Sequence, residues 1–157
     1  MEKINVKQIA ALAEDTGVFK KHEIEILEEL LTDCKKNGDK NYTLNIEYID
    51  NTPVGFTISG RTPMTDFCWD MYWIIVDKNQ HCRGIGSKLI KKMEDYILEN
   101  CDKAVIRVET SSKDMYAPAR KLYLKNGYIQ TGLIADFYAE GDSLCIFSKK
   151  IEKIKNI

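Results

Sequence analysis

The sequence lacks an excess of positive charge, and only four of its 23 basic residues are arginine: Arg61, Arg83, Arg107 and Arg120. The formal net charge is −1, whereas nucleic-acid binders gain much of their affinity by neutralising phosphates. The composition therefore argues against nucleic acid as a partner. Because arginine is scarce, the position of each one is informative.

Close pairs of cysteines are also lacking, because the five stand far apart and form no CxxC motif: Cys34, Cys68, Cys82, Cys101 and Cys145. Disulfide frameworks and structural zinc sites need close or paired cysteines. We therefore expect reduced thiols, no bound metal and a cytoplasmic protein. The N-terminal residues have no apolar signal-peptide core. No run approaches 18 apolar residues, so we expect no membrane span.

Repeats, low-complexity tracts and Pro/Gly/Ser-rich linkers are absent, and 157 residues suit one domain, which we expect over residues 1–157. Apolar periodicity predicts the order of elements. Helices are expected at 4–12, 24–34, 84–100 and 118–126. Strands are expected at 42–49, 54–59, 68–76, 104–110, 128–138 and 144–149, with a turn at 50–53. The apolar run 73–76 suits a central strand covered on both faces. The order predicts a mixed sheet with helices packed on it.

The stretch from 72 to 100 carries the strongest functional signal, because an apolar strand enters a loop with two glycines and a helix begins at once. Gly84 and Gly86 let the backbone approach a ligand and adopt positive φ. The first N–H groups of the helix and its dipole favour an anion there, which makes a pyrophosphate site. Arg83 adds charge and Ser87 a hydroxyl. Taken alone, the same loop is equally well a tight strand-to-helix turn.

Three better-known motifs fail against this sequence. The loop lacks the GxxxxGK[ST] spacing of the P-loop in nucleoside triphosphatases. Leu89 stands where the dinucleotide-binding motif GxGxxG has its third glycine. His22-Glu23 begins a zinc-protease pattern, but Ile26 stands where the second histidine is required. A nucleoside triphosphatase, a nicotinamide-dependent enzyme and a zinc protease are therefore not supported.

The run HCRGIG at residues 81–86 resembles the acyl-CoA loop [Q/R]xxGx[G/A] of the GNAT superfamily of N-acetyltransferases. It matches at both glycines and has His81 at the first position. Downstream, a strand leads into a short helix that carries Tyr123 and is followed by Gly127-Tyr128, at a separation typical of the family. The resemblance covers essentially the whole chain. It implies an α/β (α+β) fold with a mixed, mainly antiparallel sheet flanked by helices on both faces.

The resemblance also implies roles for individual residues. Tyr123 would be the general acid that protonates the CoA thiolate; otherwise it is a core tyrosine. A backbone N–H of Ile75 or Val76 would polarise the thioester carbonyl. Glu109 is the candidate base, with Asp70 or a water chain as its rivals. The residues expected to contact CoA are Ile74, Ile75, Val76, His81, Cys82, Arg83, Gly84, Ile85, Gly86, Ser87, Ser112, Tyr116, Pro118 and Arg120.

The expected function is transfer of the acetyl group of acetyl-CoA, a co-substrate, to a primary amine of a small molecule or peptide by direct attack in a ternary complex. Acetyl-CoA would lie in a cleft between strands 68–76 and 104–110. The alternatives are a non-catalytic acyl-CoA-binding or sensing domain on the same fold, and a structural interaction protein. Homodimers are frequent among such enzymes. Acidic residues near the expected acceptor side favour a cationic amine: Asp66, Asp70, Asp136, Glu140 and Asp142.

Overall fold

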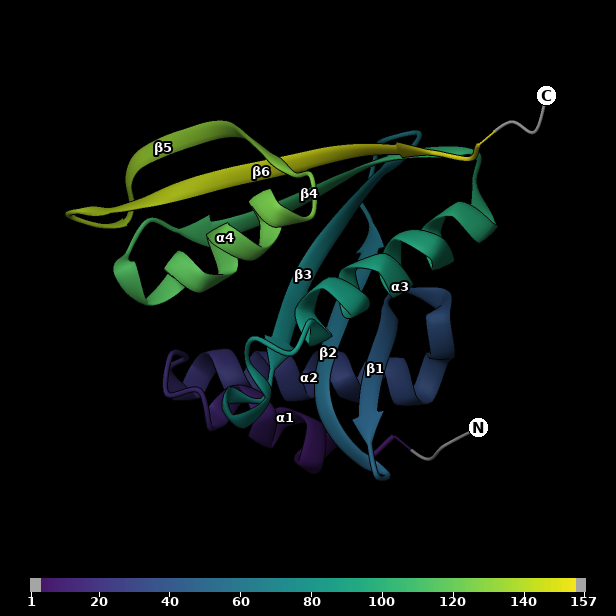
Figure 1. Cartoon of the computed structure of the whole chain (residues 1–157), viewed down its shortest axis with the longest axis vertical. Coiled ribbons are helices and arrows are strands. Elements are labelled where there is room, and N and C mark those ends of the chain that lie inside the picture. Colours follow the sequence, from purple (N-terminus) through teal and green to yellow (C-terminus); the bar gives the residue numbers. More distant parts are fainter. Residues whose placement is uncertain (1–3, 155–157) are drawn as a thin grey trace. The chain divides into compact units, whose positions relative to one another are not determined.

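The computed structural model describes residues 4–154, and its helices and strands follow the predicted order (Figure 1). The helices are α1 (Val6–Glu14), α2 (Lys21–Asn37), α3 (Ile85–Asn100) and α4 (Ala117–Lys125). The strands are β1 (Thr43–Ile49), β2 (Thr52–Arg61), β3 (Cys68–Val76), β4 (Lys103–Ser111), β5 (Ile129–Ala139) and β6 (Asp142–Glu152). Within residues 4–154, no helix combines the length and apolar character needed to cross a bilayer.

The predicted mixed, mainly antiparallel sheet is confirmed. Hydrogen-bonded strands follow the order β1-β2-β3-β4-β6-β5, with β3–β4 parallel and β1–β2, β4–β6 and β5–β6 antiparallel. The chain divides into two compact units, of which the first holds the residues up to Gly60 and Trp73–Met93, and the second holds Arg61–Tyr72 and the residues from Glu94 on. A single domain over 1–157 extends past the described residues and stays a prediction.

In the first unit, α1 and α2 pack on one face of the β1–β2 hairpin. Leu27 and Leu31 of α2 join Phe56 and Ile58 of β2 in one fully buried cluster. The helical spacing of the apolar residues in the sequence produces this contact, because residues four apart lie on one side of a helix. Gly38, with φ of +58°, ends α2.

The turn of this hairpin is tighter than the sequence predicts. Only Asp50 and Asn51 form it, with φ of +49° and +62°, while Thr52 and Pro53 already belong to β2. Two-residue turns with both φ values positive match the right-handed twist of paired strands. The strand register shifts after Glu47, which accommodates the proline at an irregularity in the pairing.

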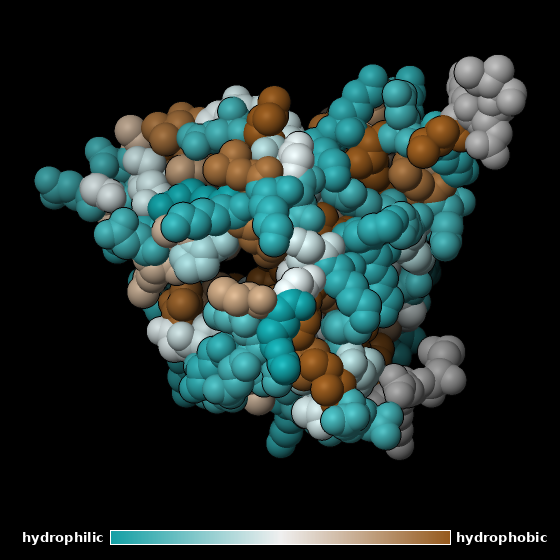
Figure 2. All heavy atoms as spheres, in the orientation of Figure 1, coloured by the Kyte–Doolittle hydropathy of each residue, from teal (hydrophilic) through white to brown (hydrophobic). Residues whose placement is uncertain are grey.

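The N-terminal half of α3 covers the opposite face of β2 in the same unit. Ile85 and Leu89 pack with Val54 in a second buried cluster. A Cβ at Gly55 would lie 2.8 Å from the Ile75 carbonyl oxygen and 2.9 Å from Leu89 Cδ1, so the close approach of α3 requires glycine here. The outward side of α3 is mainly hydrophilic in Figure 2, as expected of an amphipathic helix. Helices therefore cover both faces of the hairpin.

In the second unit, β4 has unequal pairing with its two neighbours. It pairs with β6 from Lys103–Glu152 to Ser111–Leu144. With β3 it pairs only from Cys68–Val105 to Asp70–Arg107. Within residues 61–72 and 94–154, the pairing between β3 and β4 therefore ends at Asp70, although β4 continues for four more residues.

Candidate functional site

The loop between β3 and α3 holds its backbone in two left-handed positions. Cys82 has φ of +61° and Gly84 has φ of +78°, a region that glycine adopts freely and other residues adopt with strain. A Cβ at Gly84 would meet no atom within 4 Å, so conformation rather than crowding favours glycine there. Lys88 N then donates to the Gly84 carbonyl oxygen (3.0 Å) in the first turn of α3.

Two side-chain hydrogen bonds brace this loop. His81 Nε2 lies 3.1 Å from the carbonyl oxygen of Val76, and because a carbonyl oxygen only accepts, Nε2 carries the proton. Arg83 Nη1 donates to Gln80 Oε1 (2.6 Å). His81, at the position where the family motif has Gln or Arg, therefore ties the loop to the end of β3. Gln80 orients Arg83, and the sequence motif indicated neither contact.

The start of α3 offers a positively polarised environment. The first N–H groups of a helix have no partner within the helix, and its dipole adds positive potential there. The first turn of α3 carries no acidic side chain, and residues 78–87 contain Lys78 and Arg83 but neither aspartate nor glutamate. The backbone and side chains of this loop therefore fit a phosphate group.

The end of β3 is buried less evenly than the sequence predicts. Of residues 73–76, only Ile75 is fully buried, at 6% exposure. It packs in the cluster formed with α1 and α2, whereas Ile74 and Val76 are half-buried beside Ile85 and Leu89. The expectation of complete cover on both faces is therefore wrong in part, because flanking residues of the run keep accessible surface.

Tyr123 is a buried tyrosine in α4, only 4% exposed. Its ring centroid lies 5.7 Å from that of Phe147 and 6.2 Å from that of Tyr128. Burial raises the pKa of its phenol above the ordinary value of 10.0. The hydroxyl therefore stays protonated at neutral pH, while the ring belongs to the core of the second unit.

Tyr128, from the Gly-Tyr pair of the second motif, anchors the chain after α4. Its hydroxyl donates to Glu94 Oε1 (3.2 Å), and its side chain is 1% exposed. Lys149 Nζ donates to both carboxylate oxygens of Glu94 at 2.9 and 2.8 Å and lies 5.6 Å from the Tyr128 ring centroid. Burial and then the charge of Glu94 raise the Tyr128 pKa. This cluster fixes the C-terminal side of α4.

The two rival carboxylates lie in different surroundings. Asp70 Oδ1 accepts from Arg107 Nε (2.6 Å) and its Oδ2 accepts from Thr62 Oγ1 (2.7 Å), and its side chain is 11% exposed. Glu109 is 44% exposed, and its Oε1 lies 3.8 Å from Arg107 Nη1. Asp70 is therefore bound within an ion pair, whereas Glu109 is accessible to a ligand or water.

Polar contacts join the start of α4 to the end of β4. Arg120 Nη1 donates to the carbonyl oxygens of Ser111 (2.6 Å) and Lys113 (2.9 Å). Ser112 Oγ accepts from Ser143 N (2.8 Å). Pro118 occupies the first turn of α4, and Tyr116 N donates to the Lys113 carbonyl oxygen (3.0 Å). Arg120 and Ser112, both expected near CoA, thus make contacts that hold the backbone of the second unit.

Three of the acids expected to attract a cationic acceptor already make contacts with other groups of the chain, and two of them, Asp70 and Asp142, are buried. Asp70 pairs with Arg107, and Asp136 Oδ1 accepts from Gly141 N (2.8 Å). Asp142 accepts from the Ser111 hydroxyl and lies 3.7 Å from Lys113 Nζ. The partners of Asp70 and Asp142 are distant in the sequence, so composition alone could not reveal them. The predicted acidic surface is therefore weaker than the sequence suggests.

The chain matches the model of the acetyltransferase (GNAT) family over residues 7–128. It belongs to the GNAT family. Members of this family are acetyl-CoA-dependent acyltransferases, and the matched segment contains the loop at 81–87, the β3 end and Tyr123.

Two solved GNAT structures and one sequence relative illustrate the similarity. An uncharacterized N-acetyltransferase of Methanocaldococcus jannaschii is 32% identical over 75 residues, covering 45% of this chain and 46% of that protein. The match therefore spans about half the length of that relative. A protein assigned to the GNAT family from Desulfovibrio desulfuricans is 26% identical, with a TM-score of 0.85. The match covers 94% of this chain and 92% of that protein's chain.

An aminoglycoside 6′-N-acetyltransferase in complex with coenzyme A has a TM-score of 0.76 over 99% of this chain and 97% of its own. Its identity of 15% shows the shared GNAT fold alone.

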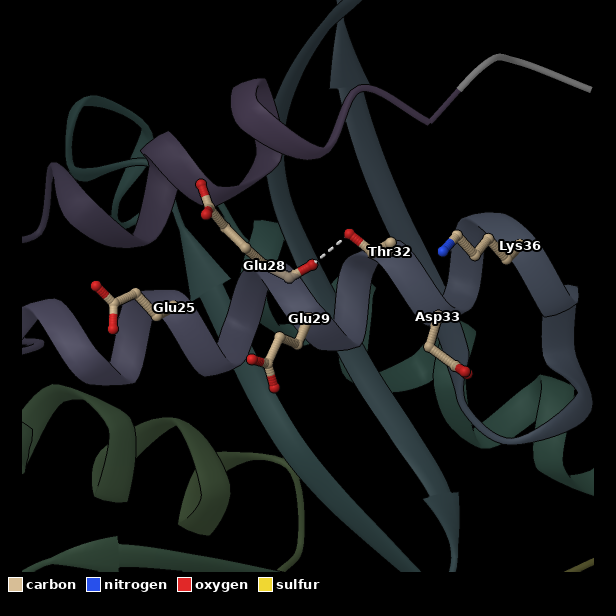
Figure 3. A pocket seen from close by; sticks show the side chains of 6 residues that line it. All are labelled: Glu25, Glu28, Glu29, Thr32, Asp33 and Lys36. Atoms are coloured by element: carbon tan, nitrogen blue, oxygen red, sulfur yellow. Dashed lines mark hydrogen bonds between the residues drawn. The ribbon is translucent and has the colours of Figure 1, made fainter.

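A surface hollow of about 530 Å³ lies along α2. None of the residues that line it was predicted to belong to the functional site. It is lined by Glu25, Glu28, Glu29, Thr32, Asp33 and Lys36. Figure 3 shows that these side chains spread from one helix in different directions, and Thr32 Oγ1 donates to the Glu28 carbonyl oxygen (2.7 Å). Such a surface is the solvated face of an amphipathic helix, and we assign it no ligand.

Proposed function

We propose that the protein transfers the acetyl group of acetyl-CoA to a primary amine by direct attack within a ternary complex. The observation that carries the proposal is the loop between β3 and α3, with left-handed backbone at Cys82 and Gly84 and no acidic residue from 78 to 87. Because the chain belongs to the GNAT family, the anion that this loop binds would be the pyrophosphate of CoA.

The residues of this loop would hold the cofactor's phosphates. Backbone N–H groups from Arg83 to Gly86 would donate to phosphate oxygens, because the first N–H groups of a helix have no acceptor within the helix. Ser87 would contribute its hydroxyl. The Arg83 side chain adds a positive charge that Gln80 orients. His81 would act by fixing the loop against Val76. Cys82, Ile85 and Gly86 complete the loop as backbone contributors.

The end of β3 would orient the acyl group. Acetyl-CoA supplies an activated thioester carbonyl, and an N–H of Ile75 or Val76 would polarise its oxygen. Ile74 and Val76 would provide half-buried apolar surface. The β3–β4 pairing that stops at Asp70 supports this role, because strands that stop pairing leave backbone donors for other partners.

Tyr123 and Glu109 would move the protons. The buried phenol of Tyr123 holds its proton at neutral pH and would donate it to the departing sulfur. Glu109, with 44% of its side chain exposed, would accept a proton from the incoming ammonium, directly or through water. Ser112, Tyr116, Pro118 and Arg120 would form the surface that meets the cofactor's pantetheine arm.

The acceptor is proposed to be an amine of a small molecule or a peptide. For the aminoglycoside 6′-N-acetyltransferase, the name of that protein indicates a small-molecule amine. We also propose that no metal or nucleic acid takes part and that the protein acts in the cytoplasm. The cysteines within the described residues are free thiols, which supports a reducing compartment.

A rate measurement on purified protein tests the proposal. Thioester absorbance of acetyl-CoA should fall only when an accepted amine is present, and the amine should gain one acetyl group. This readout avoids thiol reagents, which the exposed Cys82 would consume. If acetyl-CoA raises the melting temperature but no amine in a broad library is acetylated, the non-catalytic acyl-CoA-binding alternative holds instead.

A further inference from the structure

The contacts that hold the side chain of Tyr123 are aromatic. Its ring makes tilted contacts with Phe147 and Tyr128, at interplanar angles of 57° and 52°. A general acid must lie within hydrogen-bonding reach of the atom that it protonates, and a displacement of about 1 Å can cost on the order of 100-fold in rate. The residues that hold these two rings therefore set where the proton of Tyr123 would be delivered.

Tyr128 also holds the backbone of Tyr123. Tyr128 N donates to the Tyr123 carbonyl oxygen (3.0 Å), and Gly127 N donates to the Leu124 carbonyl oxygen (3.1 Å). Gly127, with φ of +84°, provides the left-handed residue that this Schellman arrangement needs at the end of a helix. Because Tyr128 contacts both the ring and the main chain of Tyr123, a displacement of Tyr128 would move the proposed acid.

A charged pair fixes the side chain of Tyr128 in turn. The Tyr128 hydroxyl donates to Glu94 Oε1 (3.2 Å), and Lys149 Nζ occupies both oxygens of the same carboxylate. The side chains of Glu94 and Lys149 are only 14% and 25% exposed. A pair with this little exposure is screened by salt far less than a surface pair, and hydrogen bonds to charged groups are stronger than those between neutral groups.

Strand β6 supports both rings from one face. Lys149 and Phe147 are two residues apart on β6, so their side chains point to the same side of the sheet. Phe147 contacts Tyr123, and Lys149 Nζ lies 5.6 Å from the ring centroid of Tyr128. The lysine stem also lies beside the turn, because a Cβ at Gly127 would be 3.6 Å from Lys149 Cε.

We infer that Glu94 and Lys149 are positioning residues for the acetyl transfer: they fix Tyr128 and, through it, the Tyr123 hydroxyl relative to the departing sulfur. Stability alone does not explain such a pair, because apolar side chains of similar volume often serve the fold equally well. Apolar side chains cannot, however, provide a directional acceptor for the Tyr128 hydroxyl. The inference rests on the proposed function, and neither residue would touch the substrates.

A double-mutant cycle with Tyr123 tests this inference. We expect Glu94→Ala to lower kcat about tenfold and to leave the KM for acetyl-CoA unchanged, because the phosphate loop is intact. In the Tyr123→Phe background, Glu94→Ala should cause no further fall in kcat, since it acts through the missing hydroxyl. Asp102→Ala is the control: it removes an exposed carboxylate that pairs with Lys153 at 3.1 Å, and kcat should stay at the wild-type value.

The cycle separates the inference from the function on which it rests. An unchanged kcat in Glu94→Ala would overturn the inference alone. So would a fall by the same factor in both backgrounds, which is the result expected from a loss of folded enzyme. A wild-type rate in Tyr123→Phe would instead refute the general-acid role, and the inference with it.

Far-UV circular dichroism checks that each variant folds. If Glu94→Ala does not fold, Tyr128→Phe replaces it, because this change keeps the ring and removes the same hydrogen bond from the other side. Its kcat should fall severalfold in the wild-type background and not at all in the Tyr123→Phe background. Equal factors in the two backgrounds would overturn the inference.

Discussion

The ring of Tyr123 packs against that of Phe147, with centroids 5.7 Å apart, so the proposed acid is held by the core beneath α4. Tyr123→Phe keeps this packing and removes only the hydroxyl. We expect CoA release to fall by ~10² or more, as for the loss of a general acid, while the dissociation constant for CoA changes little. Steady-state kinetics and calorimetric titration measure the two quantities.

Tyr128→Phe is the matched control, because it removes a hydroxyl from the same aromatic cluster. It leaves Glu94 without its hydrogen bond from Tyr128, so we expect a loss of about 1–3 kcal/mol in the free energy of unfolding. The turnover number should fall far less than in Tyr123→Phe. Equal turnover losses in the two variants would assign Tyr123 a packing role only.

Gly84 is predicted to matter for cofactor binding through its backbone conformation. Gly84→Ala forces a Cβ into φ near +78°, at a cost of about 1–2 kcal/mol. Relief of that strain would move the loop, so the KM for acetyl-CoA should rise about tenfold or more. Gly17→Ala carries the same strain at φ of +68°, also with no atom within 4 Å. It should lower the melting temperature similarly without changing this KM.

Gly55 is predicted to be required for the close packing of α3 on β2. In Gly55→Ala the new Cβ would meet the Ile75 carbonyl oxygen, which is backbone and cannot rotate away. We expect a loss of about 1–3 kcal/mol and reduced activity, because Ile75 is displaced. Gly132→Ala meets only the flexible Ile146 Cδ1 at 3.2 Å and should cost less. Urea denaturation with parallel rate measurements compares them.

Substitutions of Asp70 and Glu109 are predicted to affect different properties: the first lowers the stability, and the second lowers the reaction rate. Asp70→Ala removes the partner of Arg107 and should cost about 1.5–3 kcal/mol of unfolding free energy. Glu109→Gln alters an exposed side chain, so stability should change by less than about 0.5 kcal/mol. The rate with amine should nevertheless drop ~10²-fold. An unchanged rate in Glu109→Gln would favour a water chain as the base.

Cys34 is predicted to make stability depend on alkaline pH. Burial, with smaller contributions from Asp33 and Asp39, raises the pKa of its thiol from 9.0 to about 11. The unfolded chain therefore loses this proton first, and the stability present below pH 9 declines as the pH rises toward 11. The decline is on the order of 2 kcal/mol for this group. Urea denaturation at a series of pH values should show that the free energy of unfolding falls less steeply with pH in Cys34→Ala than in the wild type. The same dependence on pH in both proteins would contradict the prediction.

The sequence predicted the order and type of the elements because periodicity is a local signal. The helix from Gly84 to Asn100 and the strand from Cys68 to Val76 agree with the structure almost to the residue. The 50–53 turn was misjudged because Pro53 normally disfavours a strand, whereas a shift in pairing admits it here. A shift in strand register has no local signature.

The surroundings of the site residues depend on contacts that composition cannot supply. Arg107 selects Asp70, 37 residues away, and this choice distinguishes a structural carboxylate from the accessible Glu109. His81 departs from the family motif, yet its contact with Val76 explains how the loop tolerates the change. The solvent exposure of the edge strand β5 likewise arises from the strand order and was not visible in the alternation of its residues.

The most direct test of the proposed function incubates the purified protein with acetyl-CoA and an amine library and follows both products by mass spectrometry. The account predicts that free CoA and an N-acetylated amine form in equal amounts, and that Tyr123→Phe slows both together. Binding of acetyl-CoA with no amine-dependent release of CoA would contradict the proposed acetyl transfer.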